Sequence, residues 1–180
     1  LLLSREPGLA ITLVESISFP SLAPDAPLPY RPSFDARNTA LSRRTVATYT
    51  DLGLWNEMQI HATPIHEIHV SERGHFGMSR LVADEENVES FGQCIENAWM
   101  GLVLLRALKR CTNVTVHDGA TLTGIRQHGT HVSADIKKGD ELFTLNAPLL
   151  VAADGANSPC REMLGINATT TPYGQVALVT

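Results

Sequence analysis

The sequence predicts an α/β fold in which a parallel sheet is joined to an antiparallel meander. Two short apolar runs, 9–15 and 148–154, each end on an acidic residue, as strands of buried parallel sheets do. An amphipathic helix and several short strands lie between them in the chain. The order strand, helix, strand, meander, strand is typical of α/β proteins.

The first third of the chain alternates short regular elements with a long loop. Residues 1–5 read as a last helical turn, which Pro7-Gly8 ends, and 9–15 follows as the first strand. Five of the ten prolines lie between Pro20 and Pro32, so this stretch is expected to be an extended loop. Ser42 is a suitable N-cap for a helix that runs to Leu52, with Gly53 at its C′ position.

A hairpin and a second helix are expected next. Residues 66–70 and 76–81 read as two strands joined by a turn at 72–74. Asn97 is then expected to cap a helix with basic residues in its last turn. Its apolar face follows the i, i+3, i+4, i+7, i+8 spacing and consists of Met100, Val103, Leu104, Ala107 and Leu108.

The last third of the chain reads as strands. Residues 114–117 form a short strand, and 121–126, 130–136 and 141–145 are expected to form the meander, with Gly-containing turns between them. The apolar run 148–154 is expected to return as a parallel strand.

Composition excludes several classes of function. A net charge of −5 provides no basic surface for nucleic acid. No apolar run approaches the roughly 20 residues that span a bilayer, and no secretory signal is visible. The three cysteines are odd in number and widely spaced, which favours neutral thiols in a reducing compartment over disulfides or zinc: Cys94, Cys111 and Cys160.

The segment 149–161, LLVAADGANSPCR, carries the best candidate for a binding site. Asp154 and Gly155 follow an apolar run at the edge where α/β sheets bind ligands. Carboxylates accept hydrogen bonds from ribose hydroxyls, and glycine lets backbone approach a ligand closely. Ser158 and Pro159 can begin a helix. On these residues alone, a purely structural strand-to-helix turn is an equal alternative.

This segment resembles the DG motif of the para-hydroxybenzoate-hydroxylase-like flavoprotein monooxygenases, through Asp154-Gly155, Ser158 and Arg161. Three further stretches are similar to the ubiquinone-biosynthesis hydroxylase subgroup, and most similar to its 2-polyprenyl-6-methoxyphenol hydroxylases. They are Phe34-Asp35-Ala36-Arg37 with Ala40-Leu41-Ser42, the hairpin Val70-Ser71-Glu72-Arg73-Gly74-His75, and Gly92-Gln93-Cys94-Ile95-Glu96-Asn97.

The resemblance implies an FAD-binding Rossmann-like sheet and a set of cofactor contacts. Glu15 would hold the ribose hydroxyls of the FAD adenosine, and Arg37 would approach the flavin or its phosphates. Gln93 would lie near the ribityl or pyrophosphate region. Asp154 and Gly155 would contact the ribityl and pyrophosphate side and assist NAD(P)H binding, and Arg161 would support the Asp154 turn. No catalytic residue can be named.

The implied reaction is hydroxylation of an aromatic ring with FAD, NAD(P)H and dioxygen. The substrate would be a small hydrophobic aromatic, best matched by a polyprenylated phenol of ubiquinone biosynthesis. A cytoplasmic location follows, with peripheral attachment to the inner membrane or to a ubiquinone-biosynthesis complex left open.

The resemblance also divides the chain into domains. Residues 1–60 and 92–171 would belong to the FAD-binding domain, and 61–91 and 172–180 to part of a β-sheet substrate-binding domain. The chain is expected to be a fragment, because the G-x-G-x-x-G motif of the family would precede Leu1 and its G-D motif would follow Thr180.

Other interpretations are weaker. The pair His66 and His69 suggests a metal, but residues three apart on a strand point to opposite faces, so no metal site is expected. Catalysis by a serine nucleophile is not expected, because the sequence contains no G-x-S-x-G motif. Two alternatives stay open: another FAD-dependent oxidoreductase of this fold, such as a halogenase or prenyl reductase, or a truncated domain without catalysis.

Overall fold

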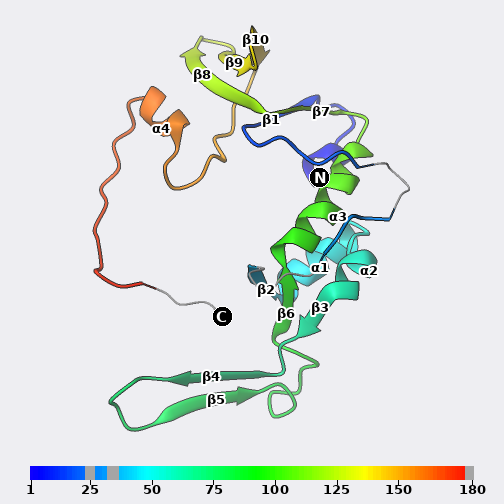
Figure 1. The fold of residues 1–180 in the computed structure, drawn as a ribbon, viewed down its shortest axis with the longest axis vertical. Helices are drawn as coiled ribbons and strands as arrows, with labels where there is room; N and C mark the ends of the chain where they lie inside the picture. Colours follow the sequence, from blue (N-terminus) through cyan, green and yellow to red (C-terminus); the bar gives the residue numbers. More distant parts are fainter. Residues whose placement is uncertain (23–26, 32–36, 177–180) are drawn as a thin grey trace. The chain divides into compact units, whose positions relative to one another are not determined.

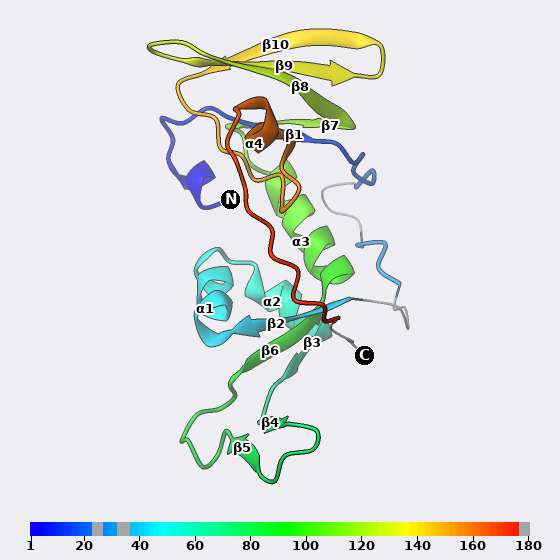
Figure 2. The ribbon, with the colours of Figure 1, turned by 90° about the vertical axis from the view of Figure 1, so that its left-hand side faces the viewer.

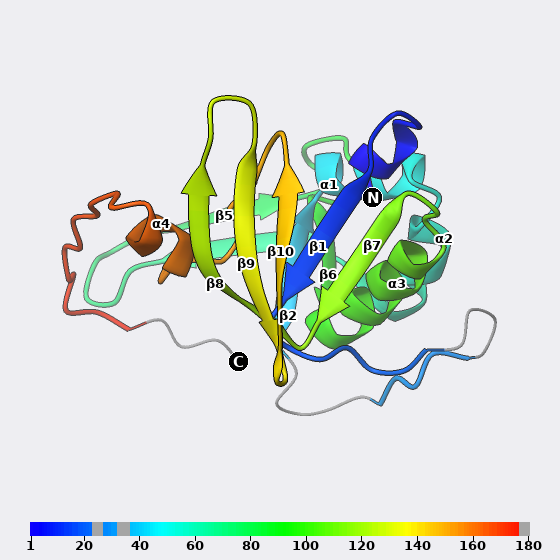
Figure 3. The same cartoon turned by 90° about the horizontal axis from the view of Figure 1, so that it is seen from above.

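The computed structural model describes residues 1–22, 27–31 and 37–176 (Figure 1). The chain divides into two compact units. The first unit contains residues 1–12 and 20–115, and the second contains 13–19 and 116 onward. Strands β1 (Ile11–Glu15) and β7 (Val114–Asp118) begin in the first unit and end in the second. They pair with each other and run in the same direction, which confirms the predicted parallel sheet (Figure 3).

The first unit is built on a three-stranded antiparallel sheet with the order β2-β6-β3. The strands are β2 (Asn38–Ser42), β6 (Gly92–Glu96) and β3 (Ala62–Pro64), and Cys94 of β6 pairs with both neighbours. The helices of this unit are α1 (Arg43–Asp51), α2 (Trp55–Met58) and α3 (Asn97–Lys109), with single 3₁₀ turns at Leu3–Arg5 and Gln59–His61 (Figure 2).

The predicted boundaries of α1 are confirmed by its two ends. The Ser42 side chain accepts a hydrogen bond from Thr45 N at 3.2 Å, which satisfies one of the free amides at the helix start. Gly53 has φ +74°, the left-handed conformation that commonly ends a helix.

The start of α3 differs from the prediction by one residue. Glu96 occupies the N-cap position without a side-chain capping bond, and Asn97 is the first helical residue. Asn97 is used in tertiary contacts instead, because its backbone N donates to Arg37 O at 2.8 Å and its side-chain oxygen accepts from the Thr39 hydroxyl. These two bonds fix the start of α3 to the strand that follows Arg37.

The core of the first unit lies between α3 and the sheet. The buried residues of this cluster are Leu41, Met58, Ile95, Trp99 and Val103. The Trp99 indole N–H donates to Met58 O at 3.1 Å. The predicted apolar face of α3 was therefore only partly right: Val103 is buried as expected, but Trp99 and Leu105 are also buried and were missed. Residue spacing predicts a narrow apolar stripe along α3, whereas the fold of this unit buries a wider face of the helix.

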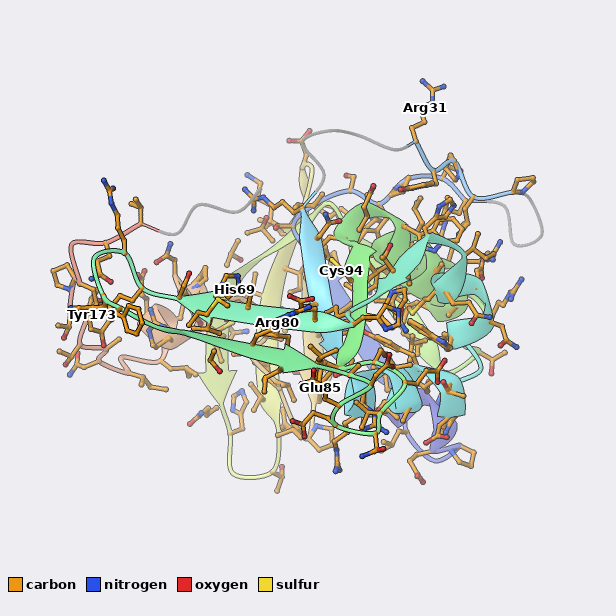
Figure 4. All side chains as sticks on the ribbon, turned by 90° about the horizontal axis from the view of Figure 1, so that it is seen from below. Arg31, His69, Arg80, Glu85, Cys94 and Tyr173 are labelled. Carbon is orange, nitrogen blue, oxygen red and sulfur yellow. The ribbon has the colours of Figure 1, made fainter. Side chains whose placement is uncertain are left out.

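The predicted hairpin is confirmed as β4 (Glu67–Ser71) and β5 (Met78–Val82). His69 and Arg80 face each other across it, as Figure 4 shows. The Arg80 guanidinium makes a two-pronged contact with the Glu67 carboxylate, at 2.7 and 2.8 Å.

The second unit contains the predicted meander, with the order β10-β9-β8 (Figure 3). Its strands are β8 (Ala120–Gln127), β9 (Val132–Lys138) and β10 (Glu141–Ala147). Its small buried cluster consists of Ala120, Ala134 and Ile136. The short helix α4 (Pro159–Met163) follows later in the chain.

The predicted strand at 148–154 is wrong. Among the described residues no strand pairs with this segment, and an extended run without ladder hydrogen bonds is not a strand. Leu150 packs on the meander cluster, whereas Leu149 and Val151 are 74% and 71% exposed. The first strand is likewise less buried than expected, because Leu13 is 37% exposed. The sequence pattern predicted burial, but the described partners do not cover both faces.

Candidate functional site

Glu15 lies where the carboxyl end of β1 leads into the loop 16–19. Its Oε1 accepts hydrogen bonds from Ile17 N at 2.9 Å and from Ser16 Oγ at 3.1 Å. Both bonds use the same carboxylate oxygen, so the loop orients the side chain through Oε1. Oxygens of this kind at a strand end accept the hydroxyls of a ribose.

Asp118 holds the same loop from the end of β7 and was not identified from the sequence. Its Oδ2 accepts from Phe19 N at 2.8 Å, and its Oδ1 accepts from Lys138 Nζ at 3.3 Å. These contacts, with the Phe19 amide contributing most, hold the pKa of the Asp118 carboxyl below its usual value. Gly119 N also donates to Ile17 O at 3.3 Å.

The turn after residue 153 is held together by its own side chains. Asp154 Oδ2 accepts from Cys160 N at 2.9 Å, and Ser158 Oγ accepts from Arg161 N at 3.0 Å. Ser158 is the N-cap of α4 and Pro159 its first residue, as the sequence predicted. Arg161 Nη2 donates to Ala156 O at 2.9 Å, so Arg161 supports the turn as expected.

The carboxylate and the thiol of this turn both have shifted pKa values. The Ser158 hydroxyl, with the Cys160 amide and thiol, lowers the pKa of the Asp154 carboxyl far below its usual range, so Asp154 is ionised. Burial and the neighbouring Asp154 charge raise the pKa of the Cys160 thiol to about 11. Cys160 is 6% exposed and therefore a neutral thiol with little nucleophilic character.

The backbone of Gly155 has open space beside it in this turn. It has φ +83°, and a Cβ built on it would meet no atom within 4 Å. A left-handed glycine with open space around it lets another molecule approach the backbone closely. The turn therefore uses the Asp154 carboxylate internally and presents the Gly155 backbone outward.

Arg37 and Gln93 belong to the first unit, whereas Glu15, Asp154 and Gly155 belong to the second. Arg37 is exposed and immediately precedes β2, and its carbonyl accepts from Asn97 N. Gln93 is half-buried in β6, where it pairs with Leu41 and Pro64. Asp35, the other charged residue of the D-x-R stretch, lies outside the described residues.

The described residues meet neither the requirements of a metal site nor those of a membrane-spanning helix. Within the described parts of the chain, no three histidine, cysteine or carboxylate side chains gather as a metal site would require. None of the helices there has the length and apolar character to cross a bilayer.

The model of a family described as FAD binding domain matches residues 29–178. The chain belongs to this family. This FAD-binding domain is 28% identical over 174 residues to the 3-demethoxyubiquinol 3-hydroxylase of Escherichia coli K12, a match that covers 96% of the chain and 42% of that protein. It is 31% identical over 146 residues to ubiquinone hydroxylase UbiL of Rhodospirillum rubrum, covering 81% of the chain and 33% of that protein. The chain therefore spans less than half the length of these relatives.

A solved structure shares the fold of the FAD-binding domain. It is the flavin-dependent monooxygenase PieE in complex with FAD and substrate, with a TM-score of 0.68 and 20% identity over 91% of the chain and 29% of that protein. These matches confirm the predicted α/β fold and the resemblance to flavoprotein monooxygenases of the ubiquinone-biosynthesis group.

The residues of the second unit suit FAD in their chemistry. A carboxylate at the end of a parallel strand suits a ribose diol, and the open Gly155 backbone suits close approach of a phosphate or ribityl group. The Asp154 carboxylate is tied to its own turn through Oδ2, which accepts from Cys160 N.

Proposed function

We propose that this chain is the FAD-binding part of an aromatic-ring hydroxylase that uses NAD(P)H and dioxygen. The observation that carries the proposal is the Glu15 carboxylate, which lies at the end of a parallel strand and is anchored through Oε1. An anchored carboxylate loses little conformational entropy when it binds a ligand, so it is preorganised as an acceptor.

In this proposal each site residue has a separate task. Glu15 accepts hydrogen bonds from the adenosine ribose, and Gly155 offers its backbone to the ribityl and pyrophosphate side. Arg37 contributes a permanent positive charge toward the flavin or its phosphates, and Gln93 an amide near the ribityl chain. Asp154 keeps the Gly155 turn closed and assists NAD(P)H binding. When bound, FAD supplies the redox chemistry toward dioxygen that protein side chains lack.

The proposed substrate is a polyprenylated phenol of ubiquinone biosynthesis. The names of the two relatives given above support this choice, since both describe hydroxylases of ubiquinone or its precursor. Such a substrate is hydrophobic. We therefore propose a cytoplasmic enzyme that associates peripherally with the inner membrane or with a ubiquinone-biosynthesis complex.

We further propose that residues 61–91 and 172–180 belong to the substrate-binding domain, and 1–60 and 92–171 to the FAD-binding domain. The hairpin β4–β5 supports this division, because it carries large apolar side chains that its own unit leaves exposed. Val70 is 60% exposed, Met78 68%, and Phe76 is fully exposed. Apolar surface of this kind marks contact with a ligand or with further protein.

The full protein tests the proposal directly. Purified protein should contain FAD, and it should oxidise NADH or NADPH faster when a prenylated phenol is added. The product should gain one oxygen atom from ¹⁸O₂, as measured by mass spectrometry. FAD binding without oxygen transfer to any phenol would favour another FAD-dependent oxidoreductase. Absence of FAD binding would favour a non-catalytic domain.

A further inference from the structure

The loop that follows Glu15 is fastened to the end of β7. Phe19 N donates to Asp118 Oδ2 at 2.8 Å, and Gly119 N donates to Ile17 O at 3.3 Å. The two bonds join residues about one hundred positions apart in the chain, and all of these residues belong to the second unit. The stretch 17–19 is therefore held at both of its ends, through Ile17 O and Phe19 N.

This fastening determines where the Glu15 carboxylate lies. Ile17 donates its amide to Glu15 Oε1, while the Ile17 carbonyl accepts from Gly119. Ile17 is thus fixed on one side by Gly119, which follows β7, and orients the carboxylate on the other. Movement of the loop away from β7 would carry the Ile17 amide with it and release the Glu15 side chain.

Asp118 is suited to this task by its charge and its surroundings. A carboxylate accepts a stronger hydrogen bond from a backbone amide than a neutral acceptor does. Lys138 Nζ donates only to the opposite oxygen, Oδ1, at 3.3 Å, so the bond from Phe19 N to Oδ2 does not depend on it. Gly119 has φ +58°, and a Cβ there would come within 2.6 Å of Ser18 Oγ, so the loop also packs closely against this turn.

We propose that Asp118 is a positioning residue for FAD binding, which fixes the loop 16–19 so that Glu15 presents its carboxylate to the adenosine ribose. The inference rests on the proposed role of Glu15 and adds a residue that does not touch the cofactor. Asp118 acts through the Phe19 amide, with Gly119 supporting the same loop through its own amide.

The test uses the full protein, freed of flavin, and measures the dissociation constant of FAD by quenching of flavin fluorescence. Asp118→Ala should raise that constant about tenfold, which corresponds to about 1.4 kcal/mol. Asp118→Asn keeps an acceptor for Phe19 N and should recover most of the affinity. Lys138→Met removes the ion pair but keeps the Phe19 bond, so it should leave the affinity unchanged.

A second ligand separates positioning from general loss of structure. An FAD analogue that lacks the 2′ and 3′ hydroxyls of the adenosine ribose should bind the wild type and Asp118→Ala equally well. Glu15→Gln should weaken FAD binding, and adding Asp118→Ala to it should cause little further loss, since both changes remove one interaction.

The outcomes distinguish this inference from the proposed function. If Glu15→Gln weakens FAD binding but Asp118→Ala does not, or if Asp118→Ala weakens FAD and the analogue equally, the positioning role is overturned and the role of Glu15 stands. The same holds if Lys138→Met matches Asp118→Ala. If Glu15→Gln leaves FAD binding unchanged, the ribose contact itself is overturned, and the inference with it.

Discussion

Replacing Gly92 by alanine should destabilise the first unit strongly, because β2 passes too close to β6 at this point. A Cβ at position 92 would lie 2.1 Å from Leu41 O and 3.1 Å from Leu41 C. Close carbon–oxygen contacts between strands are about 3.3 Å, so the strands would have to separate by about 1.2 Å. The contact is with backbone, which cannot turn away as a side chain can.

The separation would break the pairing of Gly92 with Ser42, at the end of β2 where α1 begins. We expect a loss of about 3 kcal/mol in the free energy of unfolding, at the upper end of overpacking penalties. Urea unfolding of the full protein, followed by tryptophan fluorescence, measures it through buried Trp99.

Gly101→Ala is the matched control, because it adds the same methyl group in the interior of α3, where a Cβ meets no atom within 4 Å. It should stabilise the protein by about 0.5–1 kcal/mol, since alanine is the better helix former. If Gly92→Ala changed stability by less than about 0.5 kcal/mol, the size of an ordinary surface substitution, the close approach of β2 and β6 would be refuted.

Three further predictions concern the second unit. The Cys160 thiol, with its pKa of about 11, should react with iodoacetamide at pH 8 about a hundredfold more slowly than an unperturbed thiol, and a normal rate would contradict its burial beside Asp154. Asp154→Ala should speed hydrogen exchange of the Cys160 amide and lower FAD retention and reduction more than it lowers the melting temperature; unchanged exchange would exclude the Asp154–Cys160 bond. Hydrogen bonds from Arg126 and Thr144 lower the pKa of Asp135 to about 2, so its stabilisation is complete above the ordinary value near 4 and is lost as pH falls through about 2. Arg126→Met should move that loss to higher pH in an acid titration followed by circular dichroism, and an unchanged midpoint would show that the pair contributes nothing.

The parts of the fold that sequence reasoning found are those governed by neighbours in the chain. Ser42 and Ser158 cap helices through amides three residues away, and the hairpin and meander follow from turns between adjacent strands. These interactions are local, so residue type and spacing are sufficient to predict them.

The parts that sequence reasoning missed depend on distant partners. The run 148–154 has the composition of a strand, but its pattern could not reveal that no described strand pairs with it. Asn97 has the side chain of a helix cap, yet the Thr39 hydroxyl engages that side chain instead.

The same reasoning applies to the candidate site. The strand-end position of Glu15 and the turn at Asp154 and Gly155 were visible in the sequence, because each follows an apolar run. The Asp118 contact was not, because it joins residues 99 positions apart through a backbone amide that any residue could supply. A sequence marks side chains with suitable chemistry, whereas the contacts that orient them appear only in the folded chain.

The affinity of the full protein for FAD with and without the Glu15 carboxylate decides whether Glu15 binds the adenosine ribose. Glu141→Gln, which removes the same charge at the start of β10, is the control. We predict that Glu15→Gln weakens FAD binding at least about tenfold, in line with the loss of a charge-assisted contact, and that Glu141→Gln leaves it unchanged. Equal FAD affinity for the wild type and Glu15→Gln would show that the Glu15 carboxylate does not contact the cofactor.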